Sequence, residues 1–106
     1  MRYGIINAMA EEKAALVAAM TDEKQSTIAG KLFHHGKIGN VDVVVVESGI
    51  GKVASALTTT LLITNFAVDA VINSGSAGAL GADLRIGDVV VASELAYSDT
   101  DARAFG

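Results

Sequence analysis

The stretch VVVVESGIGKVASA, residues 43–56, decides the fold class of this chain. Four consecutive valines are typical of a strand buried on both faces, and the residues from Lys52 onward have the composition of a helix. A strand, a glycine turn and a helix in this order form many phosphate- and nucleotide-binding sites. The spacing Gly49-x-Gly51-x-x-Ala54 also satisfies the dinucleotide-binding pattern, so the context has to decide which ligand the turn serves.

The context argues against a dinucleotide. That pattern needs an acidic residue about 20 positions further on, at the carboxyl end of the next strand. Asp69 has about that offset, but it precedes AVIN and therefore falls at the start of its strand. A nucleotide-hydrolase phosphate loop is excluded, because Val46 stands where its first glycine belongs and Val53 replaces its magnesium-binding Ser or Thr. A tight turn that only lets helix and sheet approach closely stays open as an alternative.

The rest of the chain continues the α/β pattern. In chain order, the sequence predicts a strand over 2–7, a helix over 10–20, a hairpin of KLFHHGKI and VDVVVV around Gly39-Asn40 and a helix over 52–66. It then predicts a buried strand that ends in a glycine-rich turn within 69–80, a strand over 86–95 and a polar loop over 97–106. We expect the second helix to pack on the sheet through Val53, Leu57 and Leu61. This order predicts a three-layer αβα sandwich with a mixed, mostly parallel central sheet, in a single domain over residues 1–106.

Composition excludes several functional classes. A net charge of −4, with eight basic residues scattered along the chain, argues against nucleic-acid binding. The amino-terminal MRYGIINAMAEEK does not have the pattern of a secretory signal, and no apolar run approaches the length of a membrane span. The chain contains no cysteine, which suits a reducing compartment. We therefore expect a cytoplasmic protein that does not enter a membrane.

Three segments rich in small or acidic residues follow predicted strands. They are NAMAEE after the first strand, SGIG after the valine run, and NSGSAG after AVI. If the three strands are parallel, all three segments lie at the carboxyl edge of the sheet, where open α/β sheets bind ligands.

Glu11 and Glu12 are the candidate acid–base residues at this edge. Their ordinary role is to stabilise the first turn of a helix as solvated carboxylates. Alternatively, one of them points to the strand edge and acts as a general base on a water molecule. His34 and His35 are adjacent on a predicted strand and face opposite sides, so we expect surface histidines and no metal site.

Together, GIINAMAEE, SGIGKVASAL, INSGSAGAL, GDVVVASE and YSDTDARAFG resemble the N-terminal half of the 5′-methylthioadenosine/S-adenosylhomocysteine nucleosidases, within the nucleoside phosphorylase superfamily. The motifs stand in the family's order over nearly the whole chain. The resemblance implies a homodimeric, cytoplasmic hydrolase of methionine salvage, without metal or organic cofactor. Such an enzyme cleaves the N-glycosidic bond of methylthioadenosine and S-adenosylhomocysteine to release adenine and a thio-ribose.

The resemblance also assigns roles to residues. Glu12 matches the glutamate that activates the water, and Ser76 matches the serine that helps to hold that water and the ribose. The remaining matches to substrate-binding positions are Ala8, Met9, Ile50, Ala77, Gly78 and Phe105. Phe105 matches a phenylalanine that reaches into the neighbouring subunit.

Two departures from the family pattern limit this expectation. Ala10 occupies a position that is often acidic in the family. The family also continues into a second half with the aspartate that protonates adenine, and no residue among these 106 matches it. We therefore expect a truncated domain with little or no activity of its own. The alternatives are a purine nucleoside phosphorylase and a non-catalytic dimerisation fragment.

Overall fold

The computed structural model describes residues 1–97. Its elements are β1 (Arg2–Asn7), α1 (Ala10–Ala18), β2 (Thr21–Ile28), β3 (Lys31–Ile38), β4 (Val41–Glu47), α2 (Lys52–Phe66) and β5 (Ala70–Asn73). Within the described residues these strands form one sheet in the order β2-β3-β4-β1-β5, in which only β3 runs against the other four. The predicted mixed, mostly parallel sheet is thus confirmed.

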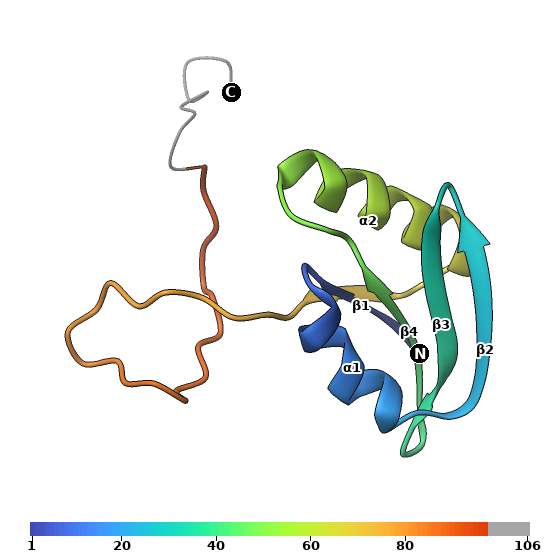
Figure 1. Cartoon of the computed structure of the whole chain (residues 1–106), viewed down its shortest axis with the longest axis horizontal. Coiled ribbons are helices and arrows are strands. Elements are labelled where there is room, and N and C mark those ends of the chain that lie inside the picture. Colours follow the sequence, from blue (N-terminus) through green and yellow to red (C-terminus); the bar gives the residue numbers. More distant parts are fainter. Residues whose placement is uncertain (98–106) are drawn as a thin grey trace.

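The two helices cover opposite faces of the sheet (Figure 1). The connection from β1 to β4 carries α1 to one side of β1, and the connection from β4 to β5 carries α2 back across β1. Crossovers between parallel strands are right-handed, so two crossovers in opposite directions place their helices on opposite faces. This arrangement gives the three predicted layers.

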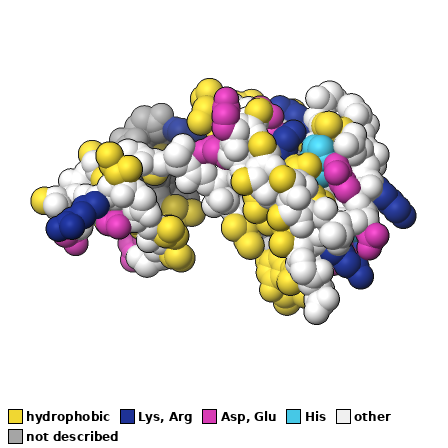
Figure 2. All heavy atoms as spheres, turned by 60° about the horizontal axis from the view of Figure 1, so that its bottom comes forward, with side chains coloured by type: hydrophobic (Ala, Val, Ile, Leu, Met, Phe, Trp, Pro, Cys, Tyr) yellow, Lys and Arg dark blue, Asp and Glu magenta, His cyan; other side chains and the backbone are white. Residues whose placement is uncertain are grey.

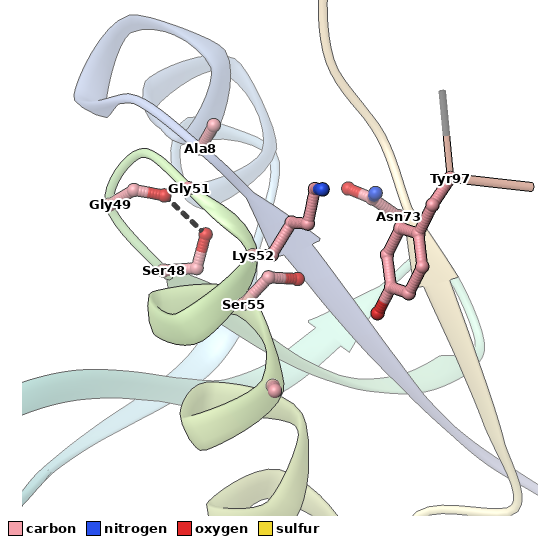
Figure 3. A pocket seen from close by; sticks show the side chains of 9 residues that line it. Ala8, Ser48, Gly49, Gly51, Lys52, Ser55, Asn73 and Tyr97 are labelled. Carbon is pink, nitrogen blue, oxygen red and sulfur yellow. Dashed lines mark hydrogen bonds between the residues drawn. The ribbon is translucent and has the colours of Figure 1, made fainter. Parts of the chain in front are cut away.

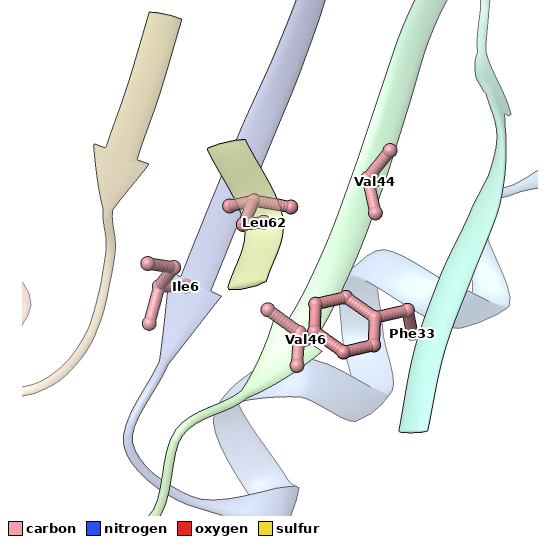
Figure 4. Packing of buried hydrophobic residues seen from close by; sticks show 5 residues of the cluster. All are labelled: Ile6, Phe33, Val44, Val46 and Leu62. Carbon is pink, nitrogen blue, oxygen red and sulfur yellow. The ribbon is translucent and has the colours of Figure 1, made fainter. Parts of the chain in front are cut away.

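The hydrophobic core lies between α2 and the central strands. Its buried cluster, drawn in Figure 4, consists of Ile6, Phe33, Val44, Val46 and Leu62. Gly4 permits the close approach of α2, because a Cβ atom at Gly4 would lie 2.4 Å from a methyl carbon of Leu62. Each fully buried side chain of this kind contributes about 1.5–3 kcal/mol to folding.

The face that α2 turns to the sheet differs from the predicted one. Thr58 and Leu62 are fully buried, whereas Val53 is 85% exposed and Leu57 is about half exposed. Leu61 is partly buried at the edge of the core. Leu62 packs into the space left by the missing side chain of Gly4. Thr58 can be buried because its hydroxyl donates a hydrogen bond to the Ala54 carbonyl within the helix. The stripe Val53–Leu57 therefore faces away from the core.

The hairpin of β3 and β4 is confirmed, with Ile38 paired to Val41 across the Gly39-Asn40 turn. The sequence did not predict β2, a polar and exposed strand that pairs with β3 at the edge of the sheet. β2 lacks the apolar alternation of a half-buried strand. It is joined to β3 through Ala29, whose φ of 51° is uncommon for alanine, so the turn carries no familiar sequence signal.

Three other predicted elements need correction. Helix α1 ends at Ala18, two residues before the predicted end. β5 was expected to be buried, but it is largely exposed because no described strand pairs with its outer side. The prediction of a strand over 86–95 is wrong, because this stretch pairs with no strand of the sheet and its apolar side chains are exposed. A strand needs a neighbour for its hydrogen bonds, and this segment extends away from the sheet in Figure 1. Figure 2 shows the same part of the chain as a lobe that stands apart from the main body of the molecule.

The histidine prediction is half right. His34 and His35 do have different partners: His34 Nδ1 lies 2.5 Å from Glu23 Oε1, and His35 Nε2 lies 2.8 Å from Asp42 Oδ1. His34, however, is only 5% exposed and is not a surface residue. Glu23 on β2 compensates the burial of the His34 imidazole by providing a hydrogen-bond partner.

Candidate active site

The carboxyl ends of β1 and β4 meet where the chain leaves the sheet in opposite directions. The two strands are neighbours, but α1 follows β1 on one face and α2 follows β4 on the other. Such a switch point opens a crevice that binds ligands in open α/β sheets. A pocket of about 460 Å³ occupies this position (Figure 3). It is lined by Ala8, Ser48, Gly49, Gly51, Lys52, Ser55, Ala56, Asn73 and Tyr97.

The glycine turn of the VVVVESGIGKVASA stretch therefore forms one wall of this pocket. Ser48 starts the turn, and its hydroxyl donates a hydrogen bond to the Gly49 carbonyl at 2.8 Å. Lys52, the first residue of α2, extends its side chain across the opening in Figure 3, and its ammonium lies 4.4 Å from the centre of the Tyr97 ring. The turn thus lines a ligand-sized hollow as well as connecting a strand to a helix.

Glu12 lies at the same edge and joins two chain segments. Its Oε2 accepts hydrogen bonds from the Ser76 backbone N–H at 2.6 Å and from the Ser76 hydroxyl at 2.9 Å. Its Oε1 accepts from the Met9 N–H at 3.0 Å, which satisfies a free donor at the start of α1. Glu12 is the third residue of α1, so this bond holds the side chain back toward the end of β1.

These bonds lower the pKa of Glu12. The largest cause is the Ser76 N–H, followed by the Ser76 hydroxyl; partial desolvation opposes them, and the N–H groups of Met9 and Ala8 add smaller lowering effects. Hydrogen bonds to the charged form favour ionisation, so Glu12 is a carboxylate at neutral pH. Three bonds hold the carboxylate and the Ala8 N–H approaches it as a fourth donor. Because Glu12 is only partly buried, water can still reach its oxygens.

The structure brings some of the sequence-predicted residues together and separates others. Met9 and Ser76 contact Glu12, and the Ala8 N–H approaches it as well. Of these four residues, only Ala8 lines the pocket. Ile50 belongs to the glycine turn but is 82% exposed and does not line the pocket.

Two further predicted residues, Ala77 and Gly78, line a separate hollow formed by the segment that follows β5, and Ser76 borders it as well. Phe105 lies outside the described residues.

Sequence reasoning missed several residues of the pocket, namely Ser48, Lys52, Ser55, Asn73 and Tyr97. A signal for two of them was present. Asn73 is the last residue of β5 and Ser48 is the first residue after β4, so both polar side chains stand at the carboxyl end of a strand. Residues in that position of parallel strands point toward the shared ligand edge.

Two other features bear on the kind of site. Within residues 1–97, no group of three His, Cys, Asp or Glu side chains is close enough to hold a metal ion. Among the same residues, no helix has the length and apolar character needed to cross a membrane.

Comparison with known proteins places this geometry in a family. Residues 2–106 match the model of the phosphorylase superfamily. The chain is 53% identical over 106 residues to the 5′-methylthioadenosine/S-adenosylhomocysteine nucleosidase of Colwellia psychrerythraea and 54% identical to that of a Shewanella species. It spans less than half of their length, 44% and 45% respectively.

Solved structures agree with the fold. A crystal structure of a candidate methylthioadenosine nucleosidase from Weissella paramesenteroides is 87% identical, with a TM-score of 0.89, and matches all of this chain and 47% of its own. The Colwellia psychrerythraea nucleosidase in complex with adenine gives a TM-score of 0.95 at 53% identity, over all of this chain and 44% of its own. On the match of its sequence and the arrangement of its sheet, the chain belongs to the phosphorylase superfamily.

Proposed function

We propose that this chain supplies the water-activating side of a nucleosidase that hydrolyses the N-glycosidic bond of methylthioadenosine and S-adenosylhomocysteine. The observation that carries the proposal is the Glu12 carboxylate, fixed by Ser76 and Met9 beside the switch-point pocket. The similarity to nucleosidases, one of them in complex with adenine and another from Streptococcus pneumoniae with a transition-state inhibitor, supports it.

In this reaction, Glu12 acts on the attacking water. The bond between the ribose carbon and adenine breaks, its electron pair leaves with adenine, and positive charge develops on the ribose. The ionised carboxylate stabilises that charge, and water donates a hydrogen bond to the partly exposed Glu12 carboxylate. As the water oxygen bonds to the cationic carbon, its proton becomes strongly acidic. A carboxylate with a lowered pKa is therefore basic enough to receive the proton.

The other assigned residues shape the substrate site. Ser76 keeps Glu12 in place and offers its hydroxyl to the water and the ribose. The proposed substrate-binding residues are Ala8, Met9, Ile50, Ser76, Ala77, Gly78 and Phe105. Small side chains at Ala77 and Gly78 let the backbone come close to a flat ligand. Protonation of the leaving adenine is not assigned to any residue of this chain.

The test is adenine release from methylthioadenosine by Glu12→Gln. The assay uses the protein as its gene encodes it, with residues 1–106 alone in parallel, for which we expect little or no turnover. Loss of the basic oxygen should lower kcat by about 10²–10⁴-fold. Glu11→Gln, the same change on the exposed neighbour, is the control and should stay within about twofold of the wild type. Full activity of Glu12→Gln would refute the proposal.

Phosphate dependence separates this proposal from a purine nucleoside phosphorylase. A phosphorylase needs an anion site, usually built with arginine. Arg2 bonds Asp42 at the amino end of β1, which is the end away from the pocket. Arg85 lies in the segment beyond β5. Arg103 is outside the described residues. We expect hydrolysis to proceed without phosphate; strict dependence on phosphate would favour the phosphorylase.

The proposal includes a homodimer. Ile50, Val53 and Leu57 form an apolar stripe on the glycine turn and the first turns of α2, and all three are exposed. Exposed apolar patches of this kind mark association surfaces. Val53→Lys should therefore shift the chain toward monomer in sedimentation analysis, while Asn65→Lys, on an exposed polar part of the same helix, should not. A dimer unaffected by Val53→Lys would contradict this surface, and dimerisation without any turnover in the gene product would favour the non-catalytic module.

A cytoplasmic location and a role in methionine salvage complete the proposal. Both rest on the sequence resemblance and on the chemistry of the two thio-nucleosides. Fractionation of the native cell, followed by detection of the protein, tests the location.

A further inference from the structure

Asn7 is a buried polar residue that the proposed mechanism does not use. It is the last residue of β1, and only 1% of it is exposed. Its side-chain nitrogen donates to the Ser74 carbonyl at 2.8 Å, and its side-chain oxygen is buried with no hydrogen-bond partner. A carbonyl oxygen can only accept, so the amide must present its nitrogen to Ser74. A buried amide that leaves one polar atom unsatisfied costs stability, which calls for an explanation of what it does.

The backbone of Asn7 holds a second loop. Its carbonyl accepts the Ser48 N–H at 2.8 Å and lies 3.4 Å from the Ser48 hydroxyl. Because β1 lies between β4 and β5, its last residue adjoins both strand exits. Asn7 therefore bonds the glycine turn through its main chain and the Ser74–Ser76 turn through its side chain.

The hydrogen bond from the Asn7 side chain lies just beyond the last backbone pairing of β1 with β5. The pairing of β1 with β5 ends at Ile6 and Asn73, and one more backbone bond joins the Ser74 N–H to the Ile6 carbonyl. Beyond that point, the Asn7 amide is the bond that fixes the Ser74 carbonyl to β1. Two residues later, Ser76 donates both of its hydrogen bonds to Glu12.

We propose that Asn7 is a positioning residue, whose side-chain amide sets the turn that presents Ser76 to Glu12. Its catalytic consequence rests on the proposed function, but the positioning itself does not. An amide suits this task because it donates to Ser74 without carrying a charge into the end of a buried strand. A displacement of about 1 Å at such a site can lower a rate by about 100-fold.

The test compares Asn7→Ala with Asn7→Leu, which keeps about the same size but has no donor for the Ser74 carbonyl. In both variants, hydrogen exchange of the Ser76 amide should rise about tenfold, the factor expected from losing one buried hydrogen bond. The pKa of Glu12, followed by NMR of its carboxyl carbon, should move up toward its usual value. Asn65→Ala is the matched control, because its amide also donates to a backbone carbonyl, that of Leu61 on the exposed side of α2. Unchanged Ser76 exchange and an unchanged Glu12 pKa in folded Asn7→Ala or Asn7→Leu would overturn the proposal.

A measurement on the wild type covers the case in which both variants unfold. One side-chain N–H of Asn7 should exchange slowly, and its resonance should shift as Glu12 titrates. An Asn7 amide that exchanges as fast as that of a solvated asparagine would overturn the proposal. These readouts do not depend on turnover, so they separate the inference from the function: full activity of Glu12→Gln refutes the function and leaves the positioning role to the NMR result.

Discussion

The two ends of the sheet use their polar groups differently. At the amino end, Arg2 donates to Asp42 at 2.9 Å and to the Phe66 carbonyl, and its backbone exchanges hydrogen bonds with Asp69. These contacts join β1 to β4, to the end of α2 and to the start of β5. At the carboxyl end, Glu12 and Ser76 bond each other next to an open pocket.

The contacts at the amino end contribute to stability, whereas the carboxyl end carries the groups proposed for the chemistry. At the amino end, the Arg2 charge is paired with Asp42, and the guanidinium also donates to the Phe66 carbonyl. The carboxyl end keeps a carboxylate that is hydrogen-bonded but still partly exposed to solvent. Changes at the amino end should therefore alter the free energy of unfolding, and changes at the carboxyl end should alter turnover and the pKa of Glu12.

Among the variants that test this comparison, Ser76→Ala is expected to have the largest effect, and that effect should be on catalysis. The variant loses the hydroxyl that donates to Glu12 but keeps the backbone N–H bond. Looser placement of the carboxylate should lower kcat by about tenfold to 100-fold in the gene product. Because Ser76 is exposed and lies outside the sheet, thermal unfolding should barely change. A large fall in the unfolding midpoint with normal turnover would reverse the comparison.

Arg2→Ala should show the opposite pattern. It removes the ion pair with Asp42 and the bond to the Phe66 carbonyl, in a partly buried site. We expect the free energy of unfolding in urea to fall by about 1–3 kcal/mol. The pKa of Glu12, at the far end of β1, should keep its wild-type value. Arg85→Ala, in the segment beyond β5, is the control and should leave unfolding unchanged. If Arg2→Ala and Arg85→Ala changed the free energy of unfolding equally, the Arg2 contacts at the amino end would contribute nothing specific to stability.

Much of this contrast could be predicted from the sequence, because apolar runs and turn residues indicate where the strands end. The valine run and the Gly39-Asn40 turn gave β4 and the hairpin, and the order of elements placed the glycine turns at one edge. Asp69 was correctly placed at the start of β5, where it bonds the Arg2 backbone. The link from Glu12 to Ser76 came from the family resemblance, since 64 residues separate them and no local pattern joins them.

What the sequence did not predict depends on tertiary contacts. The packing face of α2 is set by the gap above Gly4, which no periodicity within the helix reveals. β2 is polar, so its place in the sheet follows only from its pairing with β3. The apolar run of 86–95 satisfies the pattern of a strand, but a strand also needs a paired neighbour. The role of Asn7 depends on two loops that come together only in the folded sheet.

Gly75→Ala should have a smaller, local effect at the carboxyl end. A Cβ atom at Gly75 would lie 2.8 Å from Glu12 Oε2, too close to be accommodated without displacement. The displaced carboxylate should lose part of its bonding to Ser76, so the pKa of Glu12 should rise toward its usual value in a carboxyl-carbon titration. Gly78→Ala is the matched control, since a Cβ atom there meets nothing within 4 Å. The same pKa in Gly75→Ala and in the wild type would show that Glu12 tolerates this crowding.

Acidification should give the smallest effect, and Asp42 at the amino end should account for part of it. The Arg2 guanidinium lowers the pKa of Asp42, with a further contribution from the His35 hydrogen bond and opposition from partial burial. A carboxyl group whose pKa is lower in the folded state adds stability above its unfolded pKa, and this contribution is lost as the pH falls through the folded value, below about pH 4. Asp42→Asn should therefore flatten the decline of the unfolding midpoint on the acid side, relative to the wild type. Asp83→Asn makes the same change in the segment outside the sheet and should not. If both variants keep the full acid dependence, the loss of stability arises elsewhere, and the Arg2–Asp42 contact contributes little to closing the amino end.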